Sequence, residues 1–111
     1  QHRRANVRED YRSACADIER NWRDGDHVVS VTGTPDEYAQ STVRHYLRDR
    51  AEILASIVPA SATADAPRLH VVYRDSNYAR SERDDLLRRF EVLEQSEDRF
   101  RIRYYLLAAK R

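Results

Sequence analysis

The 111-residue chain has few of the residues from which most chemical sites are built. It has one cysteine, Cys15, so an internal disulfide is impossible and metal sites made of several cysteines are excluded. Its two glycines, Gly25 and Gly33, form neither a G-x-G-x-x-G nor a Walker pattern. Its 20 basic and 19 acidic residues nearly cancel, which argues against a strongly cationic nucleic-acid binder and an acidic disordered tail.

Long hydrophobic runs are also missing. The longest stretch without charge runs only from Ile53 to Ala64 and contains Pro59, so it is too short to span a bilayer. The first residues are polar and lead into no apolar run, unlike a signal peptide. Because the chain begins with Gln1 rather than methionine, we expect residues 1–111 to be a single domain of a longer protein.

What remains is enough apolar material, 41% of the residues, for one core. Apolar residues spaced by three and four predict a first helix whose buried face carries Cys15, Ile18 and Trp22. Runs of β-branched residues predict strands. Strands are expected at residues 28–32, 69–73, 91–95 and 101–107, and helices at about residues 9–23, 34–48 and 82–89.

Alternating strands and helices predict an α/β layered fold. We expect a mainly parallel sheet with right-handed crossovers and an antiparallel C-terminal hairpin at its edge. Residues 53–58 fit either a second helix or a buried strand, and residues 59–67 have the composition of a loop.

Local signals predict the ends of the helices and the register of the hairpin. Thr34 is expected to cap the second helix and Ser81 the last one. A turn centred on Glu97 and Asp98 would place Leu93 opposite Ile102.

Several segments carry a family resemblance in their order along the chain. They are Glu9-Asp10-Tyr11-Arg12, Asn21 to Asp26 with the strand His27-Val28-Val29, Arg68 to Asp75, Asp84 to Phe90, and Ile102 to Leu107. Together they resemble the soluble C-terminal domain of membrane-embedded, C-type glycosyltransferases that use polyisoprenyl-phosphate sugars. This group is related to protein mannosyltransferases and aminoarabinose transferases.

The resemblance implies a non-catalytic domain on the extracytoplasmic side of a membrane, in the periplasm or at the cell exterior. Its partners would be the transmembrane portion of the same protein and a sugar acceptor or lipid-linked sugar. The catalytic carboxylate of that family lies in a loop between early membrane helices, so no catalytic residue carries over to this chain. We therefore expect no sugar transfer by the domain itself.

Polar loops follow both predicted inner strands. The candidate ligand-binding residues are Thr32, Gly33, Thr34, Asp75, Ser76 and Asn77. Ligands gather at the carboxyl ends of strands in open α/β sheets, and backbone N–H groups at a helix start hold anions. A sugar phosphate or the head group of a lipid-linked sugar would satisfy both the N–H groups and the loop side chains, although Asp36 and Glu37 place negative charge nearby.

Other chemistry has weaker support. The scattered histidines, among them His27, His45 and His70, favour surface or strand-end positions over a metal site, and Asp24 and Asp26 are typical turn residues. No catalytic residue, metal or cofactor is predicted. A set of tyrosines fits either a sugar-stacking surface or the edge of the core: Tyr38, Tyr46, Tyr73, Tyr104 and Tyr105.

Two functions of other classes remain open beside the glycosyltransferase domain. One is a small phosphate- or nucleotide-binding module that uses the loops after Thr32 and before Asn77. The other is a protein-interaction domain that docks a partner strand or helix. Nucleic acid is not an expected partner, because the net charge is only +1.

Overall fold

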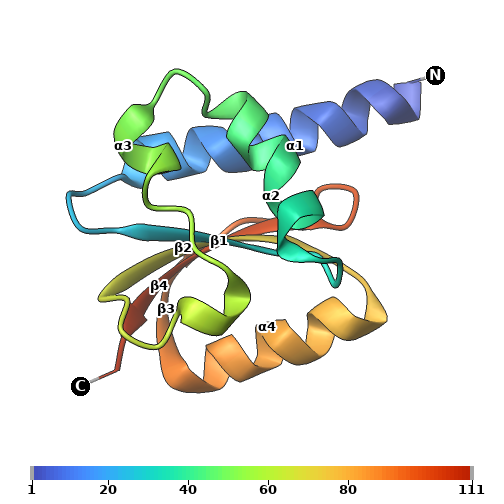
Figure 1. The fold of residues 1–111 in the computed structure, drawn as a ribbon. Coiled ribbons are helices and arrows are strands. Elements are labelled where there is room, and N and C mark those ends of the chain that lie inside the picture. Colours follow the sequence, from blue (N-terminus) through green and yellow to red (C-terminus); the bar gives the residue numbers. More distant parts are fainter. Residues whose placement is uncertain (1, 111) are drawn as a thin grey trace.

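The structure, a computed structural model, describes the backbone of residues 2–110 and the side chains of residues 10–110 (Figure 1). Its elements in chain order are α1 (His2–Asn21), β1 (His27–Val31), α2 (Asp36–Tyr46), α3 (Ala51–Leu54), the 3₁₀ turn η1 (Ala60–Ala62), β2 (Arg68–Arg74), α4 (Asn77–Arg89), β3 (Phe90–Gln95) and β4 (Ile102–Ala109). None of the helices in this described part combines the length and apolarity that crossing a bilayer requires.

The four strands form one mixed sheet in the order β1-β2-β4-β3. Strands β1 and β2 pair in parallel, as predicted, whereas β4 pairs antiparallel with both β2 and β3. The α/β class and the C-terminal hairpin are confirmed, but the sheet is not mainly parallel. The reason is that β4 lies between β2 and β3, so the hairpin supplies an inner strand as well as the edge.

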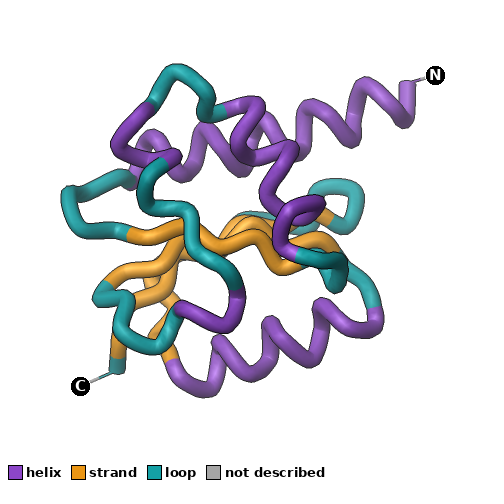
Figure 2. Tube along the Cα trace, in the orientation of Figure 1, coloured by secondary structure: helices purple, strands orange, loops and turns teal. Residues whose placement is uncertain are grey.

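The sheet is the middle of three layers. Helices α1, α2 and α3 cover one face and α4 covers the other (Figure 2). Strand β2 alternates between the two resulting cores, because Val72 packs toward α1 while Val71 and Tyr73 pack toward α4. Both faces of β2 are therefore covered by apolar side chains.

The predicted face of the first helix is confirmed. Cys15 and Ile18 are buried and Trp22 packs against the same core, although the helix runs from His2 to Asn21 rather than from about residue 9 to 23. Burial, and after it the negative charge of Glu19, raises the pKa of the Cys15 thiol to about 12. Cys15 is thus a packing residue and not a nucleophile.

Both predicted helix caps are wrong. Helix α2 begins at Asp36 without a side-chain cap, so the Thr34 hydroxyl is used elsewhere. Helix α4 begins at Asn77, because the Ser76 hydroxyl accepts a hydrogen bond from the backbone N–H of Ala79 at 3.1 Å. Most of the polar segment before Ser81 is therefore the first turn of α4, not a loop.

The ambiguous residues 53–58 are part helix and part bridge. Helix α3 ends at Leu54, and Ile57 then forms an isolated parallel bridge with Val28. The backbone N–H of Val28 donates to the oxygen of Ser56, and the N–H of Val58 donates to the oxygen of Val28. These two bonds cover the outer edge of β1.

The predicted hairpin register is wrong. The register shifts between Val92 and Glu94, so that Glu94 lies opposite Leu106 and Leu93 does not pair with Ile102. The turn is also wider than two residues, because β3 ends at Gln95 and β4 begins only at Ile102. Within the turn, Phe100 and Arg101 adopt positive φ angles of 52° and 70°. Phe100 lies in this turn and is half exposed.

Truncation of Ile18 tests the packing of α1. Ile18 is 0% exposed in the core between α1 and the sheet. We expect Ile18→Ala to lower the free energy of unfolding by about 2–4 kcal/mol, because it removes buried methyl groups and leaves a cavity. Val92→Ala, at an exposed position of β3, should cost less than about 0.5 kcal/mol in the same urea titration. Equal losses for the two variants would contradict this packing.

Candidate functional site

Three loops meet at one end of the molecule, which we call the loop end: residues 32–35, 75–76 and 96–101. They meet because β1 and β2 are parallel, while β4 begins beside the end of β2. The Ser76 hydroxyl donates to the backbone oxygen of Thr32 at 3.1 Å, and the backbone N–H of Asp75 donates to the oxygen of Arg101 at 2.9 Å. The loops are thus fixed to one another.

The six candidate residues do come together at this end, but most of their polar atoms are already used. Ser76 both caps α4 and bonds Thr32, whose own hydroxyl lies 2.7 Å from that of Thr34. Gly33 has a φ of +79°, and a Cβ at this position would lie 2.5 Å from the Ser76 hydroxyl. Close packing of these loops, rather than a ligand, accounts for the glycine.

Asp75 is held within the protein as well. Its carboxylate accepts hydrogen bonds from the Tyr73 hydroxyl at 2.6 Å and from two nitrogens of Arg80 at 2.8 and 3.0 Å. The bonds from Arg80, and after them the one from Tyr73, hold the pKa of Asp75 well below its usual value. Asn77 is exposed in the first turn of α4. Of the two, only Asn77 keeps a side chain free of bonds to the residues the structure describes.

A hollow of about 380 Å³ opens beside these loops, between α1 and α2, and we call it the tyrosine hollow. It is lined by Tyr11, Thr32, Thr34, Tyr38, Ala39, Thr42 and Arg74. Two of the six predicted residues, Thr32 and Thr34, belong to it. The other lining residues of the hollow come from α1, α2 and the end of β2, and no sequence motif connects these three elements.

Arg74 gives the tyrosine hollow its charge. It is the last residue of β2, and no carboxylate among residues 10–110 pairs with its guanidinium. Burial raises the pKa of the neighbouring Tyr11, and the positive charge of Arg74 opposes that rise. Among the described side chains, the hollow therefore combines one cation with hydroxyl groups and two aromatic rings.

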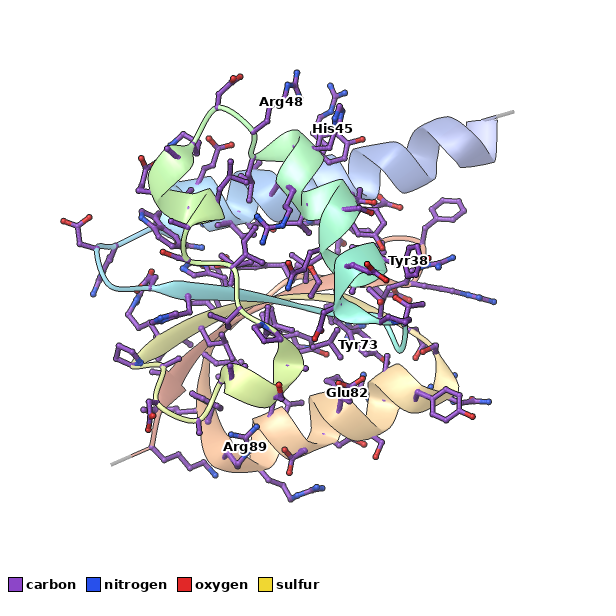
Figure 3. The ribbon with its side chains drawn as sticks, in the orientation of Figure 1. Tyr38, His45, Arg48, Tyr73, Glu82 and Arg89 are labelled. Carbon is purple, nitrogen blue, oxygen red and sulfur yellow. The ribbon has the colours of Figure 1, made fainter. Side chains whose placement is uncertain are left out.

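Only one of the five tyrosines considered as a stacking surface has an open ring. Tyr38 is 67% exposed at the start of α2 (Figure 3). Tyr73, Tyr104 and Tyr105 are buried in the cores, and Tyr46 packs against one of them. For these four the core interpretation holds, and Tyr38 alone can present a ring to a ligand from that set.

A chain of buried polar groups lies on the α1 face, toward the opposite end of the sheet. The carboxylate of Asp26 is 2.7 Å from Nε2 of His70, and Nδ1 of the same ring is 2.8 Å from the Tyr104 hydroxyl. Arg68 donates to the second oxygen of Asp26 at 3.0 Å, and Trp22 stacks on His70 with ring centroids 5.4 Å apart. The strand-end prediction for His70 is wrong, because the residue is 0% exposed.

Burial determines the charge states of His70 and Asp26 in this polar network. Desolvation lowers the pKa of His70 more than the carboxylate of Asp26 raises it, so the imidazole is neutral. Burial also opposes ionisation of Asp26, but hydrogen bonds from His70 and Arg68 outweigh it and the pKa of Asp26 is lowered. His70 therefore donates from Nε2 to the carboxylate and accepts at Nδ1 from Tyr104. The carboxylate, imidazole and hydroxyl are thus bonded in a row, but all three side chains are buried and a substrate cannot reach them.

Comparisons of the chain with protein-family models, with curated proteins and with solved structures found no match. Within the described residues, no three histidine, cysteine, aspartate or glutamate side chains are grouped so as to hold a metal ion. The hollows at the loop end and the buried network toward the other end of the sheet are therefore the features on which a function can rest.

Acid should destabilise the domain through His70. Burial lowers the folded pKa of His70 below the ordinary histidine value of 6.5, so the unfolded chain binds the proton first. Stability is then complete above pH 6.5 and falls as the pH drops below it, by up to about 1.4 kcal/mol per pH unit. Asp26, with its pKa below 3.8, adds a second loss at lower pH. Urea unfolding at several pH values measures both slopes.

Two variants make this assignment specific. His70→Gln should remove the slope that begins near pH 6.5, whatever it costs in absolute stability. His45→Gln, at an exposed position on α2 (Figure 3), should leave that slope in place. If His45→Gln removed the slope, the neutral buried imidazole would be ruled out.

A comparison of Gly33 with Gly25 tests how tightly the loop end is packed. Both have positive φ, +90° for Gly25 and +79° for Gly33, but only at Gly33 would a Cβ meet other atoms. We expect Gly25→Ala to cost about 1 kcal/mol from backbone strain. Gly33→Ala should cost a further 1–3 kcal/mol or so, because the Ser76 hydroxyl must move. Thermal unfolding compares them, and equal costs would show that these loops do not pack tightly.

Proposed function

We propose that this domain binds a phosphorylated, hydroxyl-rich ligand in the tyrosine hollow and does not itself catalyse a reaction. The observation that carries the proposal is the guanidinium of Arg74, which pairs with no carboxylate among residues 10–110 and lies at the edge of a hollow lined by threonines and by the rings of Tyr11 and Tyr38. A guanidinium pairs with phosphate oxygens, and hydroxyl groups and aromatic rings suit a sugar. A sugar phosphate or the head group of a lipid-linked sugar has both parts.

The negative charge near the start of α2 is a smaller obstacle than the sequence suggests. Neither Asp36 nor Glu37 lines the tyrosine hollow. The charge of Asp36 instead acts on Glu82 of α4, where burial and this charge raise the pKa of the glutamate. Among residues 10–110, Arg74 is the one charged side chain that lines the tyrosine hollow.

A non-catalytic role agrees with the state of the acidic groups. Asp26 and His70 are enclosed by the core, and Asp75 is neutralised by Arg80. A general acid or base needs a reachable group whose pKa is close to the working pH. This supports a binding role, such as the resemblance implies for an extracytoplasmic domain that assists a membrane glycosyltransferase in recognising its acceptor or lipid-linked sugar. The transmembrane portion of the same protein would then be its partner.

Titration with glucose 1-phosphate, followed by amide shifts in NMR spectra, tests the proposal. Shifts are expected at Thr34, Tyr38 and Arg74. Arg74→Gln should weaken binding about tenfold or more, because it removes the charge-assisted bonds to the phosphate. Arg44→Gln removes the same charge from an exposed position on α2, where the side chain bonds only Gln40, and should bind normally.

Further ligands separate the alternative functions. Glucose without phosphate should bind far more weakly, and Tyr38→Ser should weaken glucose 1-phosphate but not inorganic phosphate. Tighter binding of a nucleotide than of the sugar phosphate would favour the nucleotide-binding module. Unchanged binding by Arg74→Gln, or shifts confined to other regions, would contradict the proposed site.

A further inference from the structure

A second hollow lies at the loop end on the opposite face of the sheet, and we call it the arginine hollow. It has a volume of about 200 Å³ and is lined by Tyr73, Asp75, Arg80, Arg83, Asp98 and Arg103. Its walls come from β2, α4, the β3–β4 turn and β4. Tyr73, which lies between the sheet and α4 in Figure 3, forms part of the wall.

Two of its guanidinium groups are held in place within the protein. Arg80 forms a two-pronged pair with Asp75 at 2.8 and 3.0 Å. Arg83 lies over the ring of Tyr73, 4.7 Å from its centroid, and also bonds the exposed carboxylate of Asp84 at 3.1 Å. A ligand therefore meets guanidinium groups whose side-chain entropy is already reduced, which favours binding.

The third guanidinium has no such partner. Arg103 lies opposite Tyr73 in the sheet and is half-buried, on the face that α4 covers. No carboxylate among residues 10–110 forms an ion pair with it. Asp75 and Asp98 line the same hollow but do not pair with Arg103, so an anion in the hollow can pair directly with its guanidinium.

The hydrogen-bonding groups of the arginine hollow are mostly donors. Guanidinium groups donate and never accept. Asp75 already accepts three bonds, two from Arg80 and one from Tyr73, so it offers little further capacity. Asp98, exposed in the β3–β4 turn, is the other carboxylate of the lining. An oxyanion with several acceptor oxygens matches this set better than a hydroxyl or a cation does.

We propose that the arginine hollow is a phosphate site, in which Arg103 is the main ligand and Arg80 and Arg83 supply further donors. Its ligand would be the phosphate group of a small phosphomonoester. Planar guanidinium groups bind such oxygens in pairs, which a lysine cannot do. This site does not depend on the tyrosine hollow, because its lining residues lie on the other face of the sheet.

Inorganic phosphate is the probe, titrated at constant ionic strength against sodium chloride and followed by amide shifts. We expect saturable shifts at Arg80, Arg83 and Arg103 in the millimolar range. Arg103→Gln should weaken binding at least about tenfold, because it removes the unpaired charge. Asp98→Asn should tighten it, since the variant removes the negative charge at the mouth of the hollow.

Two controls keep the outcome interpretable. Arg88→Gln removes a positive charge from the far end of α4 and should leave phosphate binding unchanged. Arg74→Gln should also leave the phosphate-induced shifts at Arg80, Arg83 and Arg103 unchanged, although it weakens binding in the tyrosine hollow. Equal affinity of Arg103→Gln and the unaltered protein, a weaker affinity of Asp98→Asn, or shifts that sodium chloride reproduces would each overturn the phosphate site. None of these results would affect the proposed sugar phosphate site.

Discussion

The position of β2 between a parallel and an antiparallel neighbour is the constraint on which the rest of the structure depends. The parallel partner β1 brings the ends of two strands to one side of the molecule. The antiparallel partner β4 then brings the β3–β4 turn to that side as well. Because apolar side chains cover both faces of β2, polar loops are confined to the ends of the sheet. The loop end and its two hollows follow from this arrangement.

The two ends of the sheet use polar groups in opposite ways. Toward the start of β1, Asp26, His70 and Tyr104 satisfy one another inside the core, and Trp22 closes over them. At the loop end, Arg74 and Arg103 lie beside open hollows, and neither guanidinium pairs with a carboxylate among residues 10–110. A buried network that is fully bonded specifies the packing of a core. Unpaired cations at an open edge contribute little to folding, which is why both proposed ligand sites are built on them.

Local patterns predicted those parts of the fold that local forces decide. The spacing of Cys15 and Ile18 placed α1 correctly on the sheet, because burial of one helix face depends only on period. The meeting of the Thr32 and Asp75 loops was also predictable, from the parallel strands that precede them. Helix caps were not, since several hydroxyl residues compete and Ser76 was selected by its contact with Thr32 across the loops. The hairpin register depended on a bulge and on left-handed residues that no sequence rule located.

The candidate site was predicted only in part for a related reason. Its place at the strand ends follows from the fold class, but Tyr11, Tyr38 and Arg74 come from three elements whose packing sets the tyrosine hollow. His70 was missed because a histidine between Leu69 and Val71 resembles a strand-end residue. One signal was present: Val72, two residues further on, shares the face of His70 and is strongly apolar, so that face is covered too and the histidine needs a buried partner.

The irregular pairing of β3 has a consequence for how copies of the domain meet in solution. The outer edge of β1 is covered by residues 56–58, so β3 carries the open edge among the described strands. The shift at Leu93 interrupts the regular spacing of its backbone groups, and the exposed carboxylate of Glu91 adds negative charge beside it, whereas Glu94 pairs with Arg20. A second sheet that approached this edge would find neither a matching ladder nor a neutral surface. The irregular edge therefore disfavours strand pairing between copies, even though Val92 and Leu93 are exposed there.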